Sequence, residues 1–510
     1  MLERALLATW VLHGLGMLSM ALVLLPMMPG GPTVDVLDRA TRVATHPWLF
    51  RLGWLPWHLT AASDLYLAYA FVRTPWIPRW SAFAVAALTL VAVVPDQLGQ
   101  GLWETVGVEL ARDASSSAGL GRYLAYESHV FAMTGVWAAL LYTVAALGWT
   151  ACFVSAGTWT RLLTRLSIAT WGTFAVVTVG PLLPAPLTLP AKAIAVGNAL
   201  GFALLMVWLA LVTEQVLRAS RPETPHGRWA RWRAPGPGPL GRLAEIPMNS
   251  RFVRRLCSWL PVLRFRSDIT DVVYVNYLVP AKRLEAWLPE GLELQRLGPK
   301  GEWAMFTFLS YRHGHFGPAL LGPLRRLMSS PIQTNWRTYV RDPHTKKEGI
   351  YFVTNAVTTR LHSGGARLMS EGMPMHLFAD AALVRSADGT VQLWLDPGEG
   401  SAPDADATLR PAVSRLLTGA WGECFPTYEA MLRYAVPQDR AMSTRLAERE
   451  TVREEIDLGI PIDSCEPLGG AVTSRAAEAI VGDATPVCFR VPAVPFRFAG
   501  ERFDRWPRSA

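Results

Sequence analysis

The sequence predicts a polytopic helical membrane domain of about six transmembrane helices, followed by a mostly antiparallel β domain. Long apolar runs with few charges fill residues 1–217, whereas residues 267–510 have the charge density and the Pro and Gly turns of a soluble domain. In this second part, short segments rich in β-branched and aromatic residues alternate with turn signals, which is typical of an antiparallel sheet or barrel. A chain of 510 residues is also too long for one ordinary domain.

Six apolar runs are long enough to cross a bilayer, which takes about 20 residues of helix. They cover residues 5–27, 49–72, 81–101, 129–154, 162–184 and 191–217. The third run is the weakest, because Pro95 and Asp96 fall inside it. The first run has no small-residue cleavage pattern and further runs follow it, so we expect a retained span and not a signal peptide.

The distribution of arginine among the loops predicts how the spans lie in the inner cell membrane. One loop carries Arg73 with Arg79, another carries Arg161 with Arg165, and many arginines follow the sixth run. Because loops rich in Lys and Arg stay in the cytoplasm, both termini of this multi-pass chain are expected there. The five scattered cysteines form no C-x-x-C pair, which fits a reduced compartment.

A basic linker is expected between the two parts, over residues 218–266. Its Pro- and Gly-rich centre, "RAPGPGPLG", suits a flexible tether. Residues 250–268 alternate Arg with Phe, Trp and Leu, and this stretch either lies on the membrane surface or is the first packed segment of the β domain. The arginines of 218–266 are expected to attract anionic lipid headgroups. A basic chain can also bind nucleic acid, but no recognition motif supports that partner here.

Polar residues are embedded in several predicted strands of the second part. Alternation within "NWRTYVR" puts Asn335, Arg337 and Tyr339 on one face of a strand. The next segment, "YFVTNAVTTR", places Thr354 and Arg360 on one face of an otherwise apolar strand. A buried Arg must be paired or bound to a ligand, so these strands favour an internal polar pocket. Strands are expected at 271–279, 302–312, 334–341, 349–361, 366–379, 391–397, 453–462 and 486–498, and helices at 279–291 and about 408–434.

Four stretches in the right order resemble a known family: "VYVNYLVPAKRLEAWLPEGLEL", "NWRTYVRDP", "GIYFVTNAVTTRLHSGGARLMSEGMPMHL" and "PFRFAGERFDRWP". Residues 267–505 are similar to the uncharacterised YqjF-type branch of the acetoacetate decarboxylase-like superfamily. The resemblance implies a mostly antiparallel, cone-like β-barrel with a central cavity. It does not cover the membrane part.

The same resemblance argues against decarboxylase chemistry. Acetoacetate decarboxylases carry two adjacent lysines after a Gly-aromatic-Pro turn, and one of them forms a Schiff base with the substrate ketone. Here the turn Gly372–Pro374 is followed by Met375 and His376, and neither side chain can form an imine. A Schiff-base acetoacetate decarboxylase is therefore excluded, and whether the domain is an enzyme at all stays open.

The candidate ligand pocket combines the polar strand residues with the turn. Arginine would clamp a carboxylate through two hydrogen bonds. His376 and Glu371 are the candidate general bases, although His376 could equally be a hydrogen-bonded histidine of the barrel wall. His313 and His315 have strand spacing but no evident third ligand, so no metal and no cofactor are expected. The expected pocket residues are Asn335, Arg337, Tyr339, Thr354, Arg360, Glu371 and His376.

Ionisable residues inside the apolar runs are functional candidates, because charges are costly in a bilayer. They are His13, His58, Asp64 and Asp96. Three alternatives stay open: a proton or ion path through His58, Asp64 and Asp96, a haem held between His13 and His58, or hydrogen bonds that only pack helices.

The leading hypothesis is a membrane-tethered module that binds or senses a small organic ligand. The first alternative is a lysine-independent lyase or hydrolase that acts on a keto, enol or carboxylate compound. The second is a transporter that is regulated by the β domain. A continuous polar track from His58 to Asp96 would favour transport.

Overall fold

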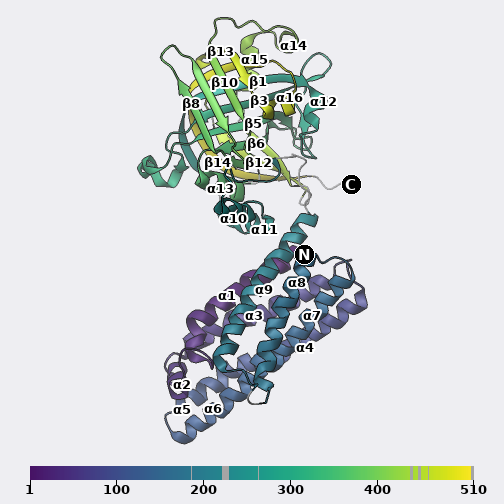
Figure 1. Ribbon diagram of the computed structural model, residues 1–510, viewed down its shortest axis with the longest axis vertical. Coiled ribbons are helices and arrows are strands. Elements are labelled where there is room, and N and C mark those ends of the chain that lie inside the picture. Colours follow the sequence, from purple (N-terminus) through teal and green to yellow (C-terminus); the bar gives the residue numbers. More distant parts are fainter. Residues whose placement is uncertain are drawn as a thin grey trace. The chain divides into compact units, whose positions relative to one another are not determined.

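The computed structural model describes residues 1–184, 187–220, 229–261, 263–370, 372–436, 440–445, 449–457 and 459–506. The chain divides into two compact units, Met1–Leu217 and Arg218–Ala510. The first unit is helical, and the second is built around one large sheet (Figure 1).

The helical unit contains five stretches that are long and apolar enough to cross a membrane. They are Leu2–Met27, Arg79–Asp113, Ser117–Ser155, Arg161–Leu182 and Lys192–Ala219. The expected run 49–72 is helical but is not among them, since Arg51, His58 and Asp64 interrupt its apolar character. The weakest expected run, 81–101, does qualify. The helices are α1 (Leu2–Ser19), α2 (Val36–Thr45), α3 (Pro47–Val72), α4 (Arg79–Leu102), α5 (Val108–Asp113), α6 (Ser117–Phe131), α7 (Ala139–Ser155), α8 (Arg161–Val179) and α9 (Ala191–Ser220).

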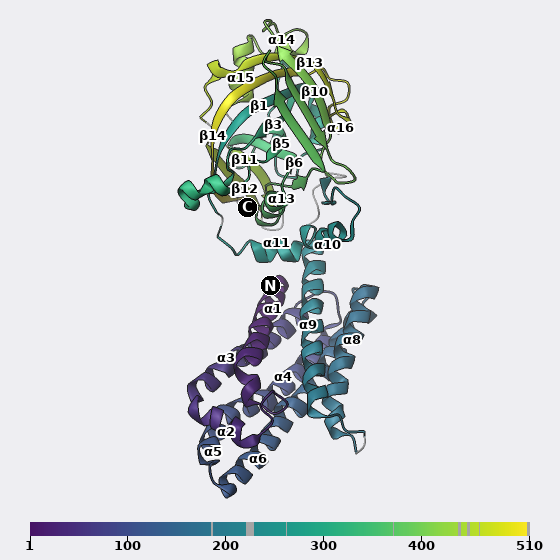
Figure 2. The ribbon, with the colours of Figure 1, turned by 60° about the vertical axis from the view of Figure 1, so that its left-hand side comes forward.

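The sheet unit contains a closed ring of strands, which confirms a mostly antiparallel second part. Neighbouring strands in the ring are antiparallel except β6 and β11, and the ring closes because β14 also pairs with β1. A second group, β13, β10, β9 and β8, continues from the other edge of β14 (Figure 2). In order, the ring strands are β1 (Phe265–Pro280), β3 (Trp303–Arg312), β5 (Ile332–Arg341), β6 (Glu348–Val357), β11 (Arg440–Arg445), β12 (Glu450–Asp457) and β14 (Val487–Arg505). The second group is β13 (Glu466–Thr473), β10 (Ala405–Pro411), β9 (Val391–Asp396) and β8 (Asp380–Arg385), and β2 (Glu293–Leu294), β4 (Gly317–Pro318) and β7 (Met375–Leu377) are short.

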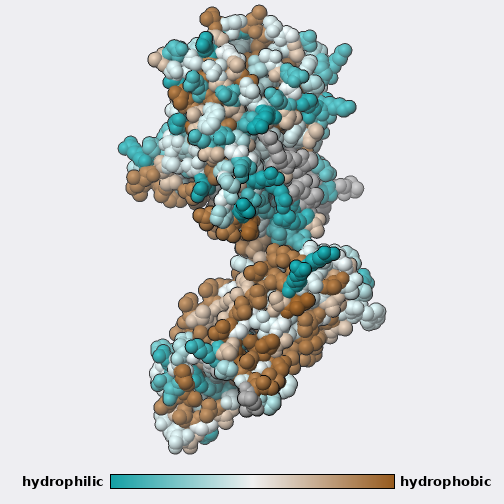
Figure 3. Space-filling model, in the orientation of Figure 1, coloured by the Kyte–Doolittle hydropathy of each residue, from teal (hydrophilic) through white to brown (hydrophobic). Residues whose placement is uncertain are grey.

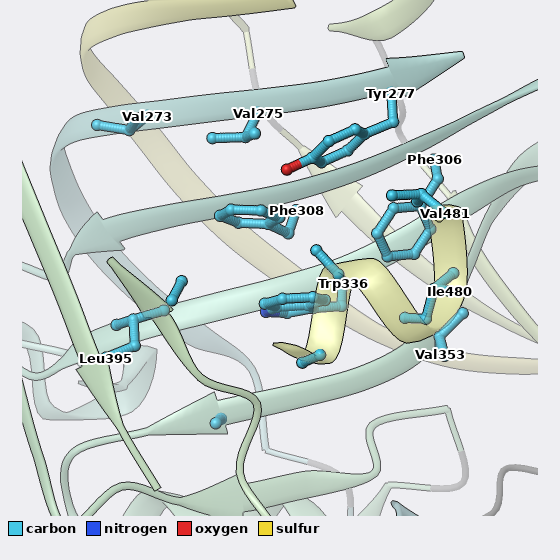
Figure 4. Close-up of a cluster of buried hydrophobic side chains, with 14 of the residues drawn as sticks. Val273, Val275, Tyr277, Phe306, Phe308, Trp336, Val353, Leu395, Ile480 and Val481 are labelled. Carbon is cyan, nitrogen blue, oxygen red and sulfur yellow. The ribbon is translucent and has the colours of Figure 1, made fainter. Parts of the chain in front are cut away.

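Two hydrophobic cores lie on opposite faces of β1, β3, β5 and β6. The outer core packs these strands against β8, β9, β10 and helix α16 (Arg475–Val481) (Figure 4). In it, Trp336 stacks on Phe308 with ring centroids 4.5 Å apart. The inner core fills the ring together with helix α15 (Tyr428–Ala435). Because side chains alternate along a strand, Trp336 belongs to the outer core and Arg337 points to the inner side.

Several expected elements differ in the structure, and the expected helix 279–291 is helical only at α12 (Ala281–Glu285). Helix α13 (Arg360–Met369) takes up the end of the expected strand 349–361 and the first residues of the expected strand 366–379, and within 366–379 only β7 is a strand. The buried residues of α13, such as Ser363 and Arg367, repeat at helical spacing, which the strand interpretation missed. The expected helix 408–434 begins as strand β10 and contains two short helices, α14 (Ala420–Cys424) and α15, because proline and glycine interrupt it.

The described part of the expected linker is not a free tether, because residues 229–257 pack on the sheet unit. Trp229 is buried and its ring centroid lies 5.5 Å from that of Trp287. The Trp232 indole N–H donates to Ser363 Oγ at 3.3 Å. The segment forms helices α10 (Pro239–Met248) and α11 (Arg251–Cys257). Its tryptophans supply the burial that the Pro, Gly and Arg content obscured. Residues 221–228 of the expected linker lie outside the described residues.

Hydrogen bonds from Arg367 hold this segment against helix α13. Its guanidinium is buried and donates to the carbonyl oxygens of Met248 at 3.0 Å and Ala230 at 3.2 Å. Arg360, on the same helix, is exposed. Hydrogen bonds to a charged group each contribute about 1.5–3 kcal/mol.

We therefore expect Arg367→Ala to speed deuterium exchange of the backbone amides of residues 229–257, measured by mass spectrometry on the full chain. Arg360→Ala is the control, and equal exchange in the two variants would refute this role.

Candidate functional site

The inner face of β5 carries three of the expected pocket residues. Asn335, Arg337 and Tyr339 alternate with outer-core residues and are all buried, as the strand pattern predicted. On the neighbouring strand β3, Thr307 pairs with Arg337 and Leu309 with Asn335. The structure therefore brings these three side chains together inside the ring.

Arg337 is a buried cation whose charge has no ionic partner among the described residues. The residue as a whole is only 3% exposed. Nη2 donates to the Ala435 carbonyl at 3.0 Å, and the guanidinium carbon lies 5.6 Å and 5.8 Å from the ring centroids of Tyr274 and Tyr339. Within the described part of the chain, Nε has no hydrogen-bond partner. A buried donor without a partner is costly, which marks Arg337 as unusual within the core.

Hydrogen bonds fix the groups around Arg337. Tyr339 donates its phenol O–H to the same Ala435 carbonyl at 3.0 Å, and this phenol oxygen also lies 3.1 Å from Thr307 Oγ1. Thr307 Oγ1 in turn donates to Asn276 Oδ1 at 2.8 Å. These contacts hold the inner wall near Arg337 in one geometry.

A second chain of hydrogen bonds runs along the end of β5. His313 Nε2 lies 2.9 Å from Gln333 Oε1, Gln333 Nε2 donates to Asn335 Oδ1 at 2.8 Å, and Asn335 Nδ2 donates to Tyr311 O–H at 3.1 Å. Burial lowers the pKa of His313 to about 3, so its ring is neutral. His315 is exposed, so the two histidines do not share a site.

A β-bulge in β6 turns Asn355, and not Thr354, toward the inner face. The register between β5 and β6 shifts at Trp336 and Arg337, so that Thr354 pairs with Trp336 and Asn355 pairs with Asn335. Thr354 therefore belongs to the outer side, contrary to the alternation that the sequence predicts. Asn355 is fully buried, and neither atom of its amide has a partner.

Arg360 and His376 do not join Arg337. Arg360 is the first residue of α13 and is exposed. His376 on β7 pairs with Ala356 of the outer core, and its Nδ1 lies 2.6 Å from Ser401 Oγ. Glu371 lies outside the described residues. Ser401 lines a pocket of about 280 Å³, together with Arg233, Pro397, Gly398, Gly400, Ala402, Asp404 and Arg475.

Glu454 is an inner-face residue that the sequence reasoning missed. It is 1% exposed, its Oε1 accepts from Ser370 Oγ at 2.5 Å, and on β12 it lies opposite Glu501 of β14. Successive strand pairings connect Tyr339 with Ile350, Ile350 with Ala441, and Ala441 with Glu454. Since paired residues share a face, Glu454 looks into the same ring as Tyr339.

The carboxyl of Glu454 touches the turn that follows α13. A Cβ added to Gly372 would lie 2.6 Å from Glu454 Oε1, so only glycine fits there without displacing the carboxyl. Burial, and then the facing Glu501, raise the pKa of Glu454 to about 8. Its surroundings therefore favour the protonated form of this carboxyl. The signal in the sequence is that Glu454 occupies an apolar position in the alternation of Val452 and Ile456.

These groups can bind an oxyanion and supply a proton, but they cannot form an imine. A guanidinium, a neutral carboxyl, a free amide and several phenols line the inner side. Met375 and His376 follow the Gly372–Pro374 turn, as noted from the sequence. The four lysines of the sheet unit, Lys282, Lys300, Lys346 and Lys347, lie at exposed or half-buried positions outside both cores.

The polar residues of the helical unit form two groups. His13 Nε2 lies 3.7 Å from Asp64 Oδ2. His58 Nδ1 lies 2.7 Å from Gln97 Oε1, and its Nε2 lies 2.9 Å from Glu104 Oε1. Both ring nitrogens of His58 are thus engaged, and ligation of a haem iron needs a free one, so the haem alternative does not fit this arrangement.

Comparisons with known proteins agree with the resemblance of the C-terminal half. The family DUF2071, described as an uncharacterized conserved protein (COG2071), matches residues 266–390, which confirms the YqjF-type resemblance there. No curated protein matches the chain. The N-terminal half stays without a recognised family.

Two solved structures are similar to about half of the chain. The enduracididine biosynthesis enzyme MppR with HEPES buffer bound has 14% identity and a TM-score of 0.33, over 48% of this chain and 88% of that one. An acetoacetate decarboxylase-like enzyme from Sphingomonas wittichii RW1 has 11% identity and a TM-score of 0.34, over 49% and 95%. Similarities of this size say nothing of the chemistry.

The pKa of Glu454 makes the stability of the fold depend on pH. Between its ordinary value of 4.5 and about 8, the folded chain keeps a proton that the unfolded chain has released. The free energy of unfolding therefore falls as the pH rises through this range. We expect Glu454→Gln to remove that part of the decline in Tm of the full chain. Glu455→Gln, on the opposite strand face, should keep the wild-type decline, and a Glu454→Gln curve parallel to wild type would contradict the assignment.

Proposed function

We propose that the sheet unit binds a small molecule with a carboxylate or similar oxyanion inside its closed ring. The observation that carries the proposal is Arg337, a buried cation with an unpaired Nε and no carboxylate partner among the described residues. A buried charge is costly unless it is paired, so an anionic ligand would relieve this cost. We further propose that the helical unit anchors the chain in the inner membrane as a multi-pass protein with both termini in the cytoplasm.

The geometry of Arg337 suggests how the ligand would be held. Nε and Nη2 form one edge of the guanidinium, which matches the two oxygens of a carboxylate. Nε is unpaired, and Nη2 now donates to the Ala435 carbonyl at the end of α15, which the ligand would replace. The free amide of Asn355 and the unpartnered hydroxyl of Tyr428 are further groups that could orient the molecule.

A lysine-independent enzyme is a second reading of the same site. Glu454 is buried and its pKa is raised to about 8, so it holds a proton that it could give to a keto or enol substrate. In this reading Glu454 takes the acid–base role that the sequence assigned to His376 and Glu371. The binding or sensing role stays the leading proposal, since it needs only the groups around Arg337.

Arg337→Met tests the binding proposal. Loss of a charge-assisted hydrogen-bond pair of about 1.5–3 kcal/mol weakens binding roughly 10- to 100-fold. The probe is pyruvate, as a small oxo carboxylate, and pyruvamide is its uncharged match. Calorimetry on the full chain should show binding of pyruvate alone, lost in Arg337→Met. Arg341→Met, the exposed arginine two inner-face positions along β5, should bind as wild type does. The proposal would be refuted if Arg337→Met and Arg341→Met bound pyruvate with equal affinity. It would also be refuted if the wild-type chain bound pyruvamide as tightly as pyruvate.

A second candidate function belongs to the helical unit, where we infer a proton-binding pair formed by His58 and Glu104. Asp96 accepts hydrogen bonds from Gln97 Nε2 at 3.1 Å, Gln100 Nε2 at 2.8 Å and Tyr142 O–H at 3.3 Å. The amide of Gln97 therefore turns its oxygen toward His58, so His58 Nδ1 carries a proton.

One further proton then lies between His58 Nε2 and Glu104 Oε1, because a hydrogen bond at 2.9 Å between a ring nitrogen and a carboxyl oxygen needs one. This pair is continuous with Asp96 through Gln97, which is the polar track that favours transport. Pro95 inside α4 and the π-helical turns η3 (Trp103–Gly107) and η4 (Ala132–Ala138) surround it. Such irregular turns are frequent at functional sites.

Proton flux through liposomes tests this second function. The full chain is reconstituted with a pH-sensitive dye inside, and the rate of internal acidification is measured after an acid pulse. We expect His58→Gln and Glu104→Gln to reduce the wild-type rate to that of empty liposomes. His46→Gln changes an exposed histidine before α3 and should leave the rate unchanged. A wild-type rate equal to that of empty liposomes would refute proton exchange.

A further inference from the structure

Helix α10 exposes its large apolar side chains instead of burying them. Leu240, Leu243 and Ile246 are 77%, 61% and 69% exposed. They recur at three-residue intervals and so lie along one side of the helix, here called the α10 stripe. An exposed apolar stripe of this kind on a fixed helix is typical of a surface that another body covers.

The opposite side of α10 is fastened to the sheet unit, so the stripe cannot turn inward. Glu245 Oε1 accepts from the Ala234 backbone N–H at 3.2 Å. Ala244 and Met248 pack against the small core around Trp232. The outward orientation of the stripe is therefore a property of the folded unit.

More exposed apolar residues lie on α13, in the residues that follow α11, and in the segment after Phe316, which contacts α13. Helix α13 contacts both α10 and α11, and its His362 Nε2 lies 3.1 Å from the Phe316 carbonyl. The chain after Phe316 enters the 3-10 segment η7 (Ala319–Leu327), whose Ala319 N–H donates to the Arg264 carbonyl at 2.7 Å. The exposed apolar residues of these elements are Trp259, Leu260, Leu320, Leu324, Leu327 and Leu361.

The charge around this surface is positive. Of the acids here, Glu245 accepts from a backbone N–H, and Asp268 pairs with Arg325 of η7 at 2.9 Å. Figure 3 shows hydrophobic residues exposed at the end of the sheet unit where Figure 1 labels α10 and α11. A basic rim around leucines and a tryptophan suits a bilayer surface that contains anionic lipid. The exposed arginines of the region are Arg231, Arg233, Arg242, Arg264, Arg266 and Arg326.

The length of chain before this surface limits how far it can be from a membrane. Helix α9, one of the five candidate spans, ends at Ser220, and Trp229 is already buried in the sheet unit. Residues 221–228 lie between them, and eight residues reach at most about 28 Å. When α9 crosses the bilayer, the segment that carries the α10 stripe is therefore tethered next to the headgroups.

We propose that the α10 stripe and the leucines of η7 insert into the headgroup region of the anionic bilayer in which the helical unit sits. The leucines enter the boundary of the acyl chains and the arginines bind lipid phosphates. This proposal rests on the membrane placement of the helical unit and is independent of the ligand at Arg337.

Site-directed spin labelling of the full chain tests the proposal. The five cysteines are changed to alanine, the chain is placed in nanodiscs with phosphatidylglycerol, and a nitroxide is attached at Leu243→Cys. We expect the label to collide with oxygen and not with water-soluble nickel chelate. The control is a label at Val413→Cys, a position after β10 where the native residue is 99% exposed, and this label should collide with the chelate. Replacing phosphatidylglycerol by phosphatidylcholine should increase the collisions of the Leu243→Cys label with the chelate.

Two results would overturn the insertion. Collision of the Leu243→Cys label with the chelate, equal to that of Val413→Cys, would place the stripe in water. Shielding from both reagents would mean that a protein surface, such as a second copy, covers it. A benzophenone side chain at Ile246 in the otherwise wild-type chain gives a second measurement that keeps all cysteines. It should form a photo-adduct with lipid, and an adduct with protein alone would contradict the proposal.

Discussion

The pairing of β1 with β14 sets the environment of every side chain on the inner face of the sheet. It runs from Phe265 opposite Phe498 to Asn276 opposite Val487 and turns an open sheet into a ring. Without it, two strand edges and the inner face would be open to water. With it, Arg337 and Glu454 are both buried, and burial raises the pKa of the Glu454 carboxyl. The polar chemistry of the unit therefore depends on a backbone contact that involves none of the polar side chains.

The same physical rule applies to the helical unit in a different form. There His13 lies beside the carboxylate of Asp64 and His58 beside the amide of Gln97, and in both cases the neighbour lies on another helix. Buried polar groups in apolar surroundings need such partners. Arg337 differs because its neighbours are phenols and one carbonyl, which carry no full negative charge. Because of that difference, we propose an anionic ligand for the sheet unit and a proton-binding pair for the helical unit.

The strands of the fold were predictable where alternation and β-branched content are strong, as in β1, β3, β5 and β14. The same alternation predicted that Asn335, Arg337 and Tyr339 share a face, because the extra residue of the bulge lies on β6 and β5 itself is regular. The sequence could not place Thr354, since a bulge adds one residue without any change in composition. Helix α13 was missed because its glycines and mixed polarity resemble a turn between strands. Glu454 was missed because a charged segment reads as surface until its partner strands are known.

The carbonyl of Ala435 has a position with a wider consequence. It accepts hydrogen bonds from both Arg337 and Tyr339 and closes the last turn of α15. In the proposed binding mode, an anion on the Nε–Nη2 edge of Arg337 would displace the first of these bonds, so binding inside the ring would be linked thermodynamically to the docking of α15. By reciprocity, a contact that holds α15 in place from outside would weaken that binding by the same factor. The end of α15 would then compete with the anion for the guanidinium.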